Sequence, residues 1–258
     1  MSWYVPSTVN SILDELVIYS TPGTYTLNIP PGVQSIKYEI IGAGGDNFYG
    51  ATRAGNGGYI KGTMTLPPST TFIKIVVGAV GNEVFNPTIP SGATYINIPT
   101  TGPLFVMAGA GGCPTNAAGN QTGGWGGGWT SLPPSNQVAI GGDGTSSGDG
   151  VGAQGGQING GGAAGSCASF LPGVPGNGRP TPENFEQASG GFNDLAPGGS
   201  GYTGGGSGCA SGGGSSYYNS TYTTVTASYP GNLLPSDLLP LYGRGARGGY
   251  ASVELIFN

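Results

Sequence analysis

Histidine is absent from this chain of 258 residues, and charged residues make up only 7% of it. The missing imidazole removes the commonest general base and the commonest neutral metal ligand of proteins. A nucleophile would then depend on a carboxylate or a lysine, and the three lysines, Lys37, Lys61 and Lys74, all lie in strand-like segments. We therefore expect no catalytic residues, no cofactor and no enzymatic activity.

Basic residues are too few and too scattered to suit a nucleic acid. The chain has seven Lys and Arg and a net charge of −5, and only Arg244 and Arg247 lie close together. This pattern does not neutralise a phosphate backbone. Asp14 and Glu15 interrupt the apolar part of the first twenty residues, which therefore do not resemble a secretory signal. No uncharged apolar run reaches the roughly 20 residues that span a bilayer, so we expect no membrane insertion.

Cysteine and aspartate, which can also bind metals, show no metal-binding pattern. The three cysteines, Cys113, Cys167 and Cys209, are far apart and form no C-x-x-C pair. Their odd number argues against a disulfide framework, so we expect reduced thiols, with one disulfide plus a free thiol as the alternative. Asp143 and Asp149 lie in GGDGTSSGDG, which lacks the spacing of a calcium loop and is typical of a solvated turn.

Glycine is the most abundant residue, with 55 positions, and it is densest over 141–165 and 198–214. No strict Gly-X-Y period occurs, so the chain is not collagen-like. A structureless loop of this length is rare inside a compact fold. We therefore expect polyproline-II-like segments, whose backbone groups bond to neighbouring segments because glycine lets the backbones approach closely.

Short segments with a period of two and turn residues between them predict an antiparallel β-sandwich or barrel. Before the glycine-rich region they are Thr24–Ile29, Ser35–Ile41, Gly58–Leu66, Thr71–Val77, Thr94–Ile98 and Leu104–Met107. Two more follow it, Tyr217–Tyr229 and Tyr250–Phe257. The last of these cannot bury its apolar face alone, so we expect it to pair with the N-terminal strands.

This organisation predicts three parts of the chain. Residues 1–20 form an N-terminal anchor or plug, with the one convincing helix over Ser7–Leu16. Residues 21–108 and 217–258 form the β-sandwich, and 109–216 form a glycine-rich insertion. The fold class is therefore all-β, with polyproline-II-like segments in the insertion.

Four stretches resemble the glycine-rich domain of viral and bacterial surface proteins: TYTLNIPPGVQSIKYEIIGAGG at 24–45, GGYIKGTMTLPPSTTFIKIVVG at 57–78, GGGSGCASGGGSSYY at 204–218 and GGYASVELIF at 248–257. Similar modules occur in receptor-tyrosine-kinase ectodomains, in tip adhesins of phage tail fibres and in giant-virus proteins. The resemblance implies a TNF-like or jelly-roll sandwich that carries polyglycine-II helices. The chain departs from the receptor relatives, because it lacks a signal peptide and a cysteine framework.

The resemblance and the low charge favour a non-enzymatic structural protein of a virus particle, as a minor capsid, fibre or surface component. Such a protein would be assembled in the host cytoplasm, would bind other structural proteins of the particle, and would form a homo-oligomer, with a trimer as the first expectation. The alternative is an adhesin of the cell surface or extracellular space that binds a host glycan or receptor through loops at the glycine-rich tip.

The candidate binding residues are aromatic. Two tryptophans lie in GGWGGGW and three tyrosines follow the last glycine run: Trp125, Trp129, Tyr217, Tyr218 and Tyr222. Aromatic faces beside Asn, Ser and Thr suit a sugar ring or a protein partner. The plainer alternative is that these rings cover the ends of the glycine-rich bundle.

The candidate interface residues are the leucines of NLLPSDLLPLYG, namely Leu233, Leu234, Leu238 and Leu239. Apolar patches of this kind usually mark interaction sites when they are exposed. The alternative is that the four leucines cover an open end of the chain's own core.

Overall fold

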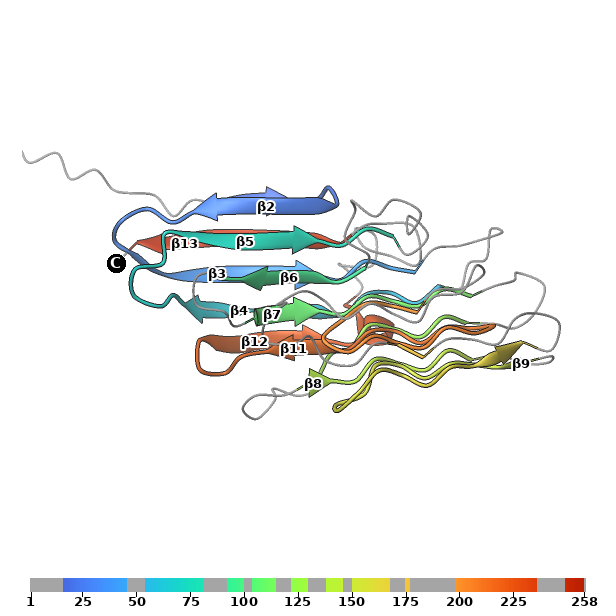
Figure 1. The fold of residues 1–258 in the computed structure, drawn as a ribbon. Helices are drawn as coiled ribbons and strands as arrows, with labels where there is room; N and C mark the ends of the chain where they lie inside the picture. Colours follow the sequence, from blue (N-terminus) through green and yellow to red (C-terminus); the bar gives the residue numbers. More distant parts are fainter. Residues whose placement is uncertain are drawn as a thin grey trace, which may run out of the picture.

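The computed structural model describes residues 16–45, 54–80, 92–99, 104–114, 122–129, 138–145, 150–167, 175–176, 198–235 and 249–257. These residues form an all-β fold with two main antiparallel sheets, and none of them lies in an α-helix (Figure 1). The predicted fold class is therefore confirmed at the level of an all-β, antiparallel architecture.

The first sheet contains both ends of the described chain. Its strand order is β1 (Leu16–Tyr19), β13 (Tyr250–Phe257), β3 (Val33–Ile41), β4 (Tyr59–Thr65), β12 (Thr223–Tyr229). Strand β13 pairs with β3 from Tyr250 opposite Ile41 to Phe257 opposite Val33. This register confirms that the closing strand returns to the N-terminal strands.

The second sheet has six strands, in the order β2 (Gly23–Asn28), β5 (Phe72–Val77), β6 (Thr94–Asn97), β7 (Leu104–Ala108), β11 (Ser216–Tyr218), β8 (Val138–Ala139). Two short strands, β9 (Gly150–Val151) and β10 (Ser166–Cys167), form a separate pair. The six strands predicted before the glycine-rich region are all present, with no end shifted by more than two residues.

Two predicted elements need correction. Leu16, predicted as the last residue of a helix, begins strand β1, which pairs with β13; the rest of Ser7–Leu16 lies outside the described residues. The predicted strand Tyr217–Tyr229 is two strands, because a turn at Asn219–Tyr222 passes the chain from one sheet to the other. Asn219 fixes this turn through its side chain, whose Oδ1 accepts a hydrogen bond from the Thr221 N–H at 3.0 Å.

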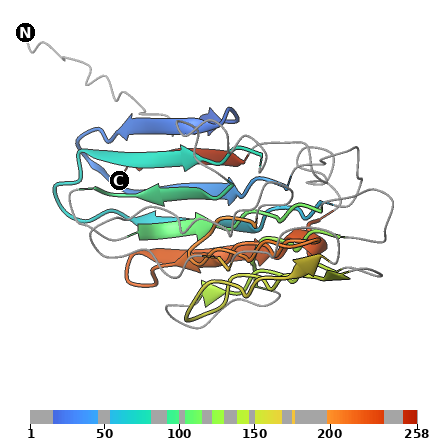
Figure 2. The same cartoon turned by 45° about the vertical axis from the view of Figure 1, so that its right-hand side comes forward.

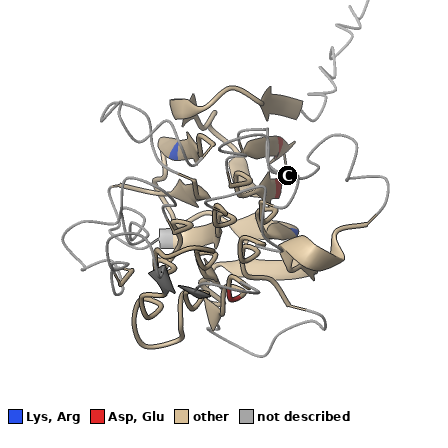
Figure 3. Cartoon of the chain, turned by 90° about the vertical axis from the view of Figure 1, so that its right-hand side faces the viewer, with Lys and Arg blue, Asp and Glu red and all other residues tan. Residues whose placement is uncertain are grey.

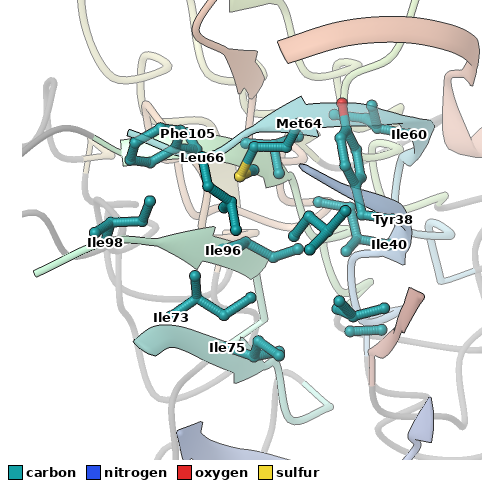
Figure 4. Packing of buried hydrophobic residues seen from close by; sticks show 14 of the residues in the cluster. Tyr38, Ile40, Ile60, Met64, Leu66, Ile73, Ile75, Ile96, Ile98 and Phe105 are labelled. Carbon is teal, nitrogen blue, oxygen red and sulfur yellow. The ribbon is translucent and has the colours of Figure 1, made fainter. Parts of the chain in front are cut away.

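One apolar core is shared by the two sheets. The period of two in β3 places Ile36, Tyr38 and Ile40 on its inner face, each at most 2% exposed. They pack with residues of both sheets, among them Ile60, Met64, Ile73, Ile75, Ile96 and Phe105 (Figure 4). Burial of each such side chain contributes about 1.5–3 kcal/mol, so this cluster is the main source of stability for the sheets.

The glycine-rich segments all leave the sheets at one end, to the right in Figure 1 and still together in Figure 2. Strand β3 runs into 42–45, 54–58 leads into β4, β7 runs into 109–114, and 198–215 leads into β11. We call these segments, with 122–129, 141–145, 152–156 and 161–165, the glycine array. The array therefore includes continuations of β3 and β4 as well as residues of the predicted insertion 109–216.

The two ends of the described chain lie at the opposite end of the sheets. Gly249, just before β13, donates a hydrogen bond to the Gly78 carbonyl at the array end, and β13 then runs away from the array to Phe257. Leu16 of β1 lies opposite Glu254, near the same far end. The molecule thus has an array end and a terminal end (Figure 1).

Backbone hydrogen bonds connect each array segment to several neighbours. In segment 109–114, Gly111 donates to the Ala43 carbonyl at 2.9 Å and Gly112 donates to the Gly124 carbonyl at 2.7 Å. The same segment accepts hydrogen bonds from the N–H groups of Gly58 and Gly214, each at 2.8 Å. A strand in a sheet has at most two bonded neighbours, whereas this segment has four, so the array is bonded in three dimensions.

Glycine is required in the array because the backbones touch. A Cβ added at Gly58, Gly111 or Gly124 would lie 1.9 Å from a carbonyl oxygen of a neighbouring segment. Seen end-on, the segments have triangular outlines (Figure 3), as expected for three residues per turn. Burial follows the same period in 122–128, where positions 122, 125 and 128 are half-buried and the glycines between them are buried.

Candidate functional site

Three of the five candidate aromatic residues pack against the main core. Trp129 meets Tyr218 edge-on, with ring centroids 5.3 Å apart at 86°, and Tyr218 is only 3% exposed. Tyr222 lies 4.9 Å from the ring of Phe105, a fully buried core residue. The geometry of these three rings fits a structural role inside the sandwich.

Tyr217 lies on the opposite face of β11. Its ring stacks on Tyr202 with centroids 4.3 Å apart and an interplanar angle of 10°. Both rings pack against a second apolar cluster, formed by Val76, Ala93, Tyr95 and Met107. Tyr217 is therefore separated from Tyr218 by the sheet itself, and the two do not contribute to one surface.

Trp125 is the one candidate aromatic residue in the interior of an array segment. Its ring lies flat against Gly142 of the adjacent segment, since a Cβ at Gly142 would be 2.3 Å from two ring carbons. The backbone holds the two segments together, because the Gly142 N–H donates to the Trp125 carbonyl at 2.8 Å. Trp125 is half-buried, so part of its ring faces solvent.

Two polar residues on the segments that follow that of Trp125 were not predicted as binding residues. Asp143 and Gln154 are exposed. Asp143 follows the buried Gly142, and Gln154 precedes the buried Gly155 of the adjacent segment. The Asp143 carboxylate accepts a hydrogen bond from the Gly155 N–H at 2.9 Å, which joins its segment to that of Gln154. The signal in the sequence is a polar residue beside paired glycines, GGD at 141–143 and QGGQ at 154–157.

Trp125, Asp143 and Gln154 thus lie on three consecutive segments of the array, and we call them the outer strip. Segments 141–145 and 152–156 lie along the lower edge of the array in Figure 1, and the Gly142 N–H joins the first of them to the segment of Trp125. The strip presents an aromatic face, a carboxylate and a primary amide, which together offer apolar contact and both hydrogen-bond acceptors and donors. It is the best-defined candidate binding surface of the described residues.

The candidate interface leucines fall into different environments. Leu233, in the short 3₁₀ helix Gly231–Leu233, is 53% exposed. Leu234 is 7% exposed and packs with Ile41 and Tyr59. Leu238 and Leu239 lie outside the described residues. Leu234 therefore covers the chain's own core, while Leu233 remains available to a partner.

Tyr38 places a hydroxyl in the core that has no hydrogen-bond partner among the described residues. The ring crosses Gly62 of the neighbouring strand, where an added Cβ would lie 2.7 Å from the hydroxyl oxygen. Burial, with a smaller contribution from Tyr218, raises the pKa of Tyr38 well above its ordinary value. A buried polar group without a partner lowers stability, because its lost hydration is not replaced.

We expect Tyr38→Phe to raise the free energy of unfolding by about 1 kcal/mol, because it removes this hydroxyl and keeps the ring. Urea denaturation at neutral pH measures the change. The folded pKa of Tyr38 lies above its unfolded value near 10, so the wild type loses stability as pH rises above about 10. The variant should lose less over the same pH range, and a destabilised Tyr38→Phe would contradict the assignment.

The state of the cysteines differs from the expectation of reduced thiols. Cys209 is disulfide-bonded, whereas Cys113 is a buried free thiol, so the expectation of reduced thiols throughout is wrong and the alternative of one disulfide plus a free thiol fits. Ser211 holds the Cys113 backbone, because its Oγ accepts from the Cys113 N–H and donates to the Cys113 carbonyl, each at 2.6 Å.

Two searches of the described residues gave no site. They contain no group of three or more His, Cys, Asp or Glu side chains placed to hold a metal ion. Within the same residues, no helix is both long enough and apolar enough to span a bilayer. In comparisons with known proteins, no family model matches the chain and no curated protein sequence matches it.

Proposed function

We propose that the chain is a non-enzymatic structural protein at or near the outer surface of a virus particle. The observation that carries the proposal is the separation of the array end from the terminal end. Leu16 and Phe257, the two ends of the described chain, both lie at the terminal end, so attachment through this end would leave the array directed outward. Other structural proteins of the particle are then the partners at the terminal end.

The properties of the array support a display role. Its backbone groups bond to neighbours in several directions, which makes a stiff element without a large apolar core. Few described positions are coloured as charged residues in the view onto this end (Figure 3). The fold that accompanies this proposal is a TNF-like or jelly-roll sandwich whose array segments are polyglycine-II helices, as the three-residue period favours.

Assembly into a homo-oligomer, with a trimer as the first expectation, is part of the proposal. Leu233 is exposed, as are Leu16 and Ile18 on the edge strand β1. An edge strand with exposed apolar residues and no charge of its own is poorly protected against pairing with another chain. Contacts between copies would cover these apolar residues, so that the few charged residues of the chain would have less apolar surface to keep in solution.

Mass spectrometry of purified particles tests the proposal. We expect the chain to be present at high copy number, in a fixed molar ratio to the main capsid protein. Carbodiimide labelling should modify Asp143, an exposed carboxylate of the array, in intact particles as fully as in disrupted ones. Absence of the chain from washed particles rejects the proposal, and labelling of Asp143 only after disruption rejects the outward orientation.

A second function, attachment to a host glycan or receptor from the cell surface or particle surface, is favoured by the outer strip. Trp125 offers a partly exposed aromatic face with polar side chains beside it. The other candidate aromatics support this function less, because Tyr218 is buried and Tyr217 packs against the second apolar cluster.

A further inference from the structure

We propose that the outer strip, Trp125, Asp143 and Gln154, is a binding site for neutral carbohydrate. A pyranose ring has an apolar face of C–H groups and a rim of hydroxyls. The strip offers the aromatic plane of Trp125 to the apolar face of the sugar, and the side chains of Asp143 and Gln154 can form hydrogen bonds with its hydroxyls. This inference rests on the second proposed function, attachment to a glycan, and it does not depend on the location of the protein in a particle.

The Trp125 ring is held in position before a ligand arrives. One face lies on Gly142, where any side chain would occupy the space of the ring. The segments that carry Trp125 and Gly142 are joined by a backbone hydrogen bond of 2.8 Å. A ring that is already ordered loses little conformational entropy on binding, so more of the stacking energy appears as affinity.

Asp143 is also oriented in advance. One carboxylate oxygen accepts the Gly155 N–H at 2.9 Å, which fixes the side chain on the rim of the array. A carboxylate has about four acceptor positions in all, so it can still accept hydrogen bonds from sugar hydroxyls. Such bonds to an ionised acceptor are stronger than those between neutral groups.

Gln154 completes the strip on the next segment. Its side chain is exposed, and its amide can both donate to and accept from hydroxyls. Its backbone is fixed, because its N–H donates to the Ala163 carbonyl at 3.0 Å and its carbonyl accepts the Gly206 N–H at 2.9 Å. Gln157 follows about 9 Å further along the same segment, one turn at three residues per turn.

This spacing favours an oligosaccharide over a single sugar, because a second ring bound along the segment would reach Gln157. The Gln157 amide is itself positioned, since its Nε2 donates to the Gly155 carbonyl at 2.7 Å. We therefore expect a trisaccharide to bind more tightly than its monosaccharide unit.

The charge of the strip selects against acidic sugars. Asp143 is its one ionised group, and the lysines of the described residues, Lys37, Lys61 and Lys74, lie on strands β3, β4 and β5 of the sheets. A sialylated or uronic glycan would bring a second negative charge to the strip, and no basic side chain of the described residues is placed on the strip to balance it. Neutral glycans are therefore the ligand class that fits.

The test is titration calorimetry of the full chain with lactose, maltotriose, cellotriose, chitotriose, mannotriose and 3′-sialyllactose, after a glycan array has ranked a wider set of neutral and acidic glycans. We expect a neutral oligosaccharide to bind and sialyllactose to bind more weakly than lactose. Trp125→Ala should weaken binding about tenfold or more, because it removes the stacking face. Asp143→Asn and Gln154→Ala should each weaken it by a smaller factor.

Trp129→Phe is the matched control, because Trp129 packs against the core and lies outside the strip. It should leave the affinity unchanged, and circular dichroism should confirm that every variant remains folded. The proposal is overturned if no neutral glycan binds, if acidic glycans bind best, or if Trp129→Phe and Trp125→Ala weaken binding equally. None of these results bears on the particle test, because copy number in a particle and affinity for a glycan are measured independently.

Discussion

Gly213→Ala is expected to lower the free energy of unfolding by on the order of 3 kcal/mol, through overpacking and broken hydrogen bonds. A Cβ at Gly213 would lie 2.0 Å from the Trp125 carbonyl oxygen and 2.4 Å from its carbon. Neither atom can move aside alone, because both belong to the backbone of a bonded segment. Gly213 also donates to Gly142 and accepts from Gly156, so a displacement would weaken both bonds.

Gly160→Ala is the matched control for this substitution. It changes the same residue type in the same region, but a Cβ at Gly160 meets no atom within 4 Å. We expect a change within about 0.5 kcal/mol, as for an ordinary surface position. Urea denaturation of both variants measures the difference. Equal stabilities would mean that close backbone contact does not hold the array together.

Cys209→Ala is expected to lower the free energy of unfolding by about 2–4 kcal/mol, because it removes a covalent restriction on the unfolded chain. The wild type should show a similar loss when dithiothreitol is present during thermal unfolding. The variant should be insensitive to the reductant, since its disulfide is already gone. The loss of stability from the substitution and the loss from dithiothreitol should therefore not add.

Cys113→Ala serves as the control for the thiol itself. Cys113 is a buried free thiol, so its replacement costs packing contacts but leaves the disulfide in place. The melting temperature of this variant should still fall on reduction. If Cys113→Ala abolishes the response to dithiothreitol and Cys209→Ala retains it, the assignment of the two cysteines is wrong.

The sheets could be predicted because their pattern is local. Buried and more exposed residues alternate over Ser35–Ile40 in β3 and over Tyr250–Ile256 in β13, which is enough to identify both strands from the chain alone. Strand β1 has four residues and follows a segment with helical spacing, so its pairing with β13 was not visible. The two-residue strands β8, β9 and β10 carry no pattern at all.

The outer strip could be predicted only in part. Trp125 was selected for its residue type, but Trp129 and Tyr218 were selected for the same reason and are packed against the core. Which residue faces solvent is decided by the neighbours of each array segment, and those neighbours are distant in the sequence. The structure places Gly142 beside Trp125 and Gly155 beside Asp143. Only these contacts make the neighbouring residues, Asp143 and Gln154, candidates for the same site.

The position of β13 has a consequence for the order in which the protein folds. This strand comes last in the chain among the described strands, yet it lies between β1 and β3 inside the first sheet. Until it emerges from the ribosome, β1 has no partner in that sheet and one side of β3 is open. Pairing over so large a sequence separation is slow, because the loop between the strands must close first. The first sheet therefore cannot be completed before Tyr250–Phe257 has been synthesised, and a chain that ends before Tyr250 exposes an unprotected strand edge to aggregation.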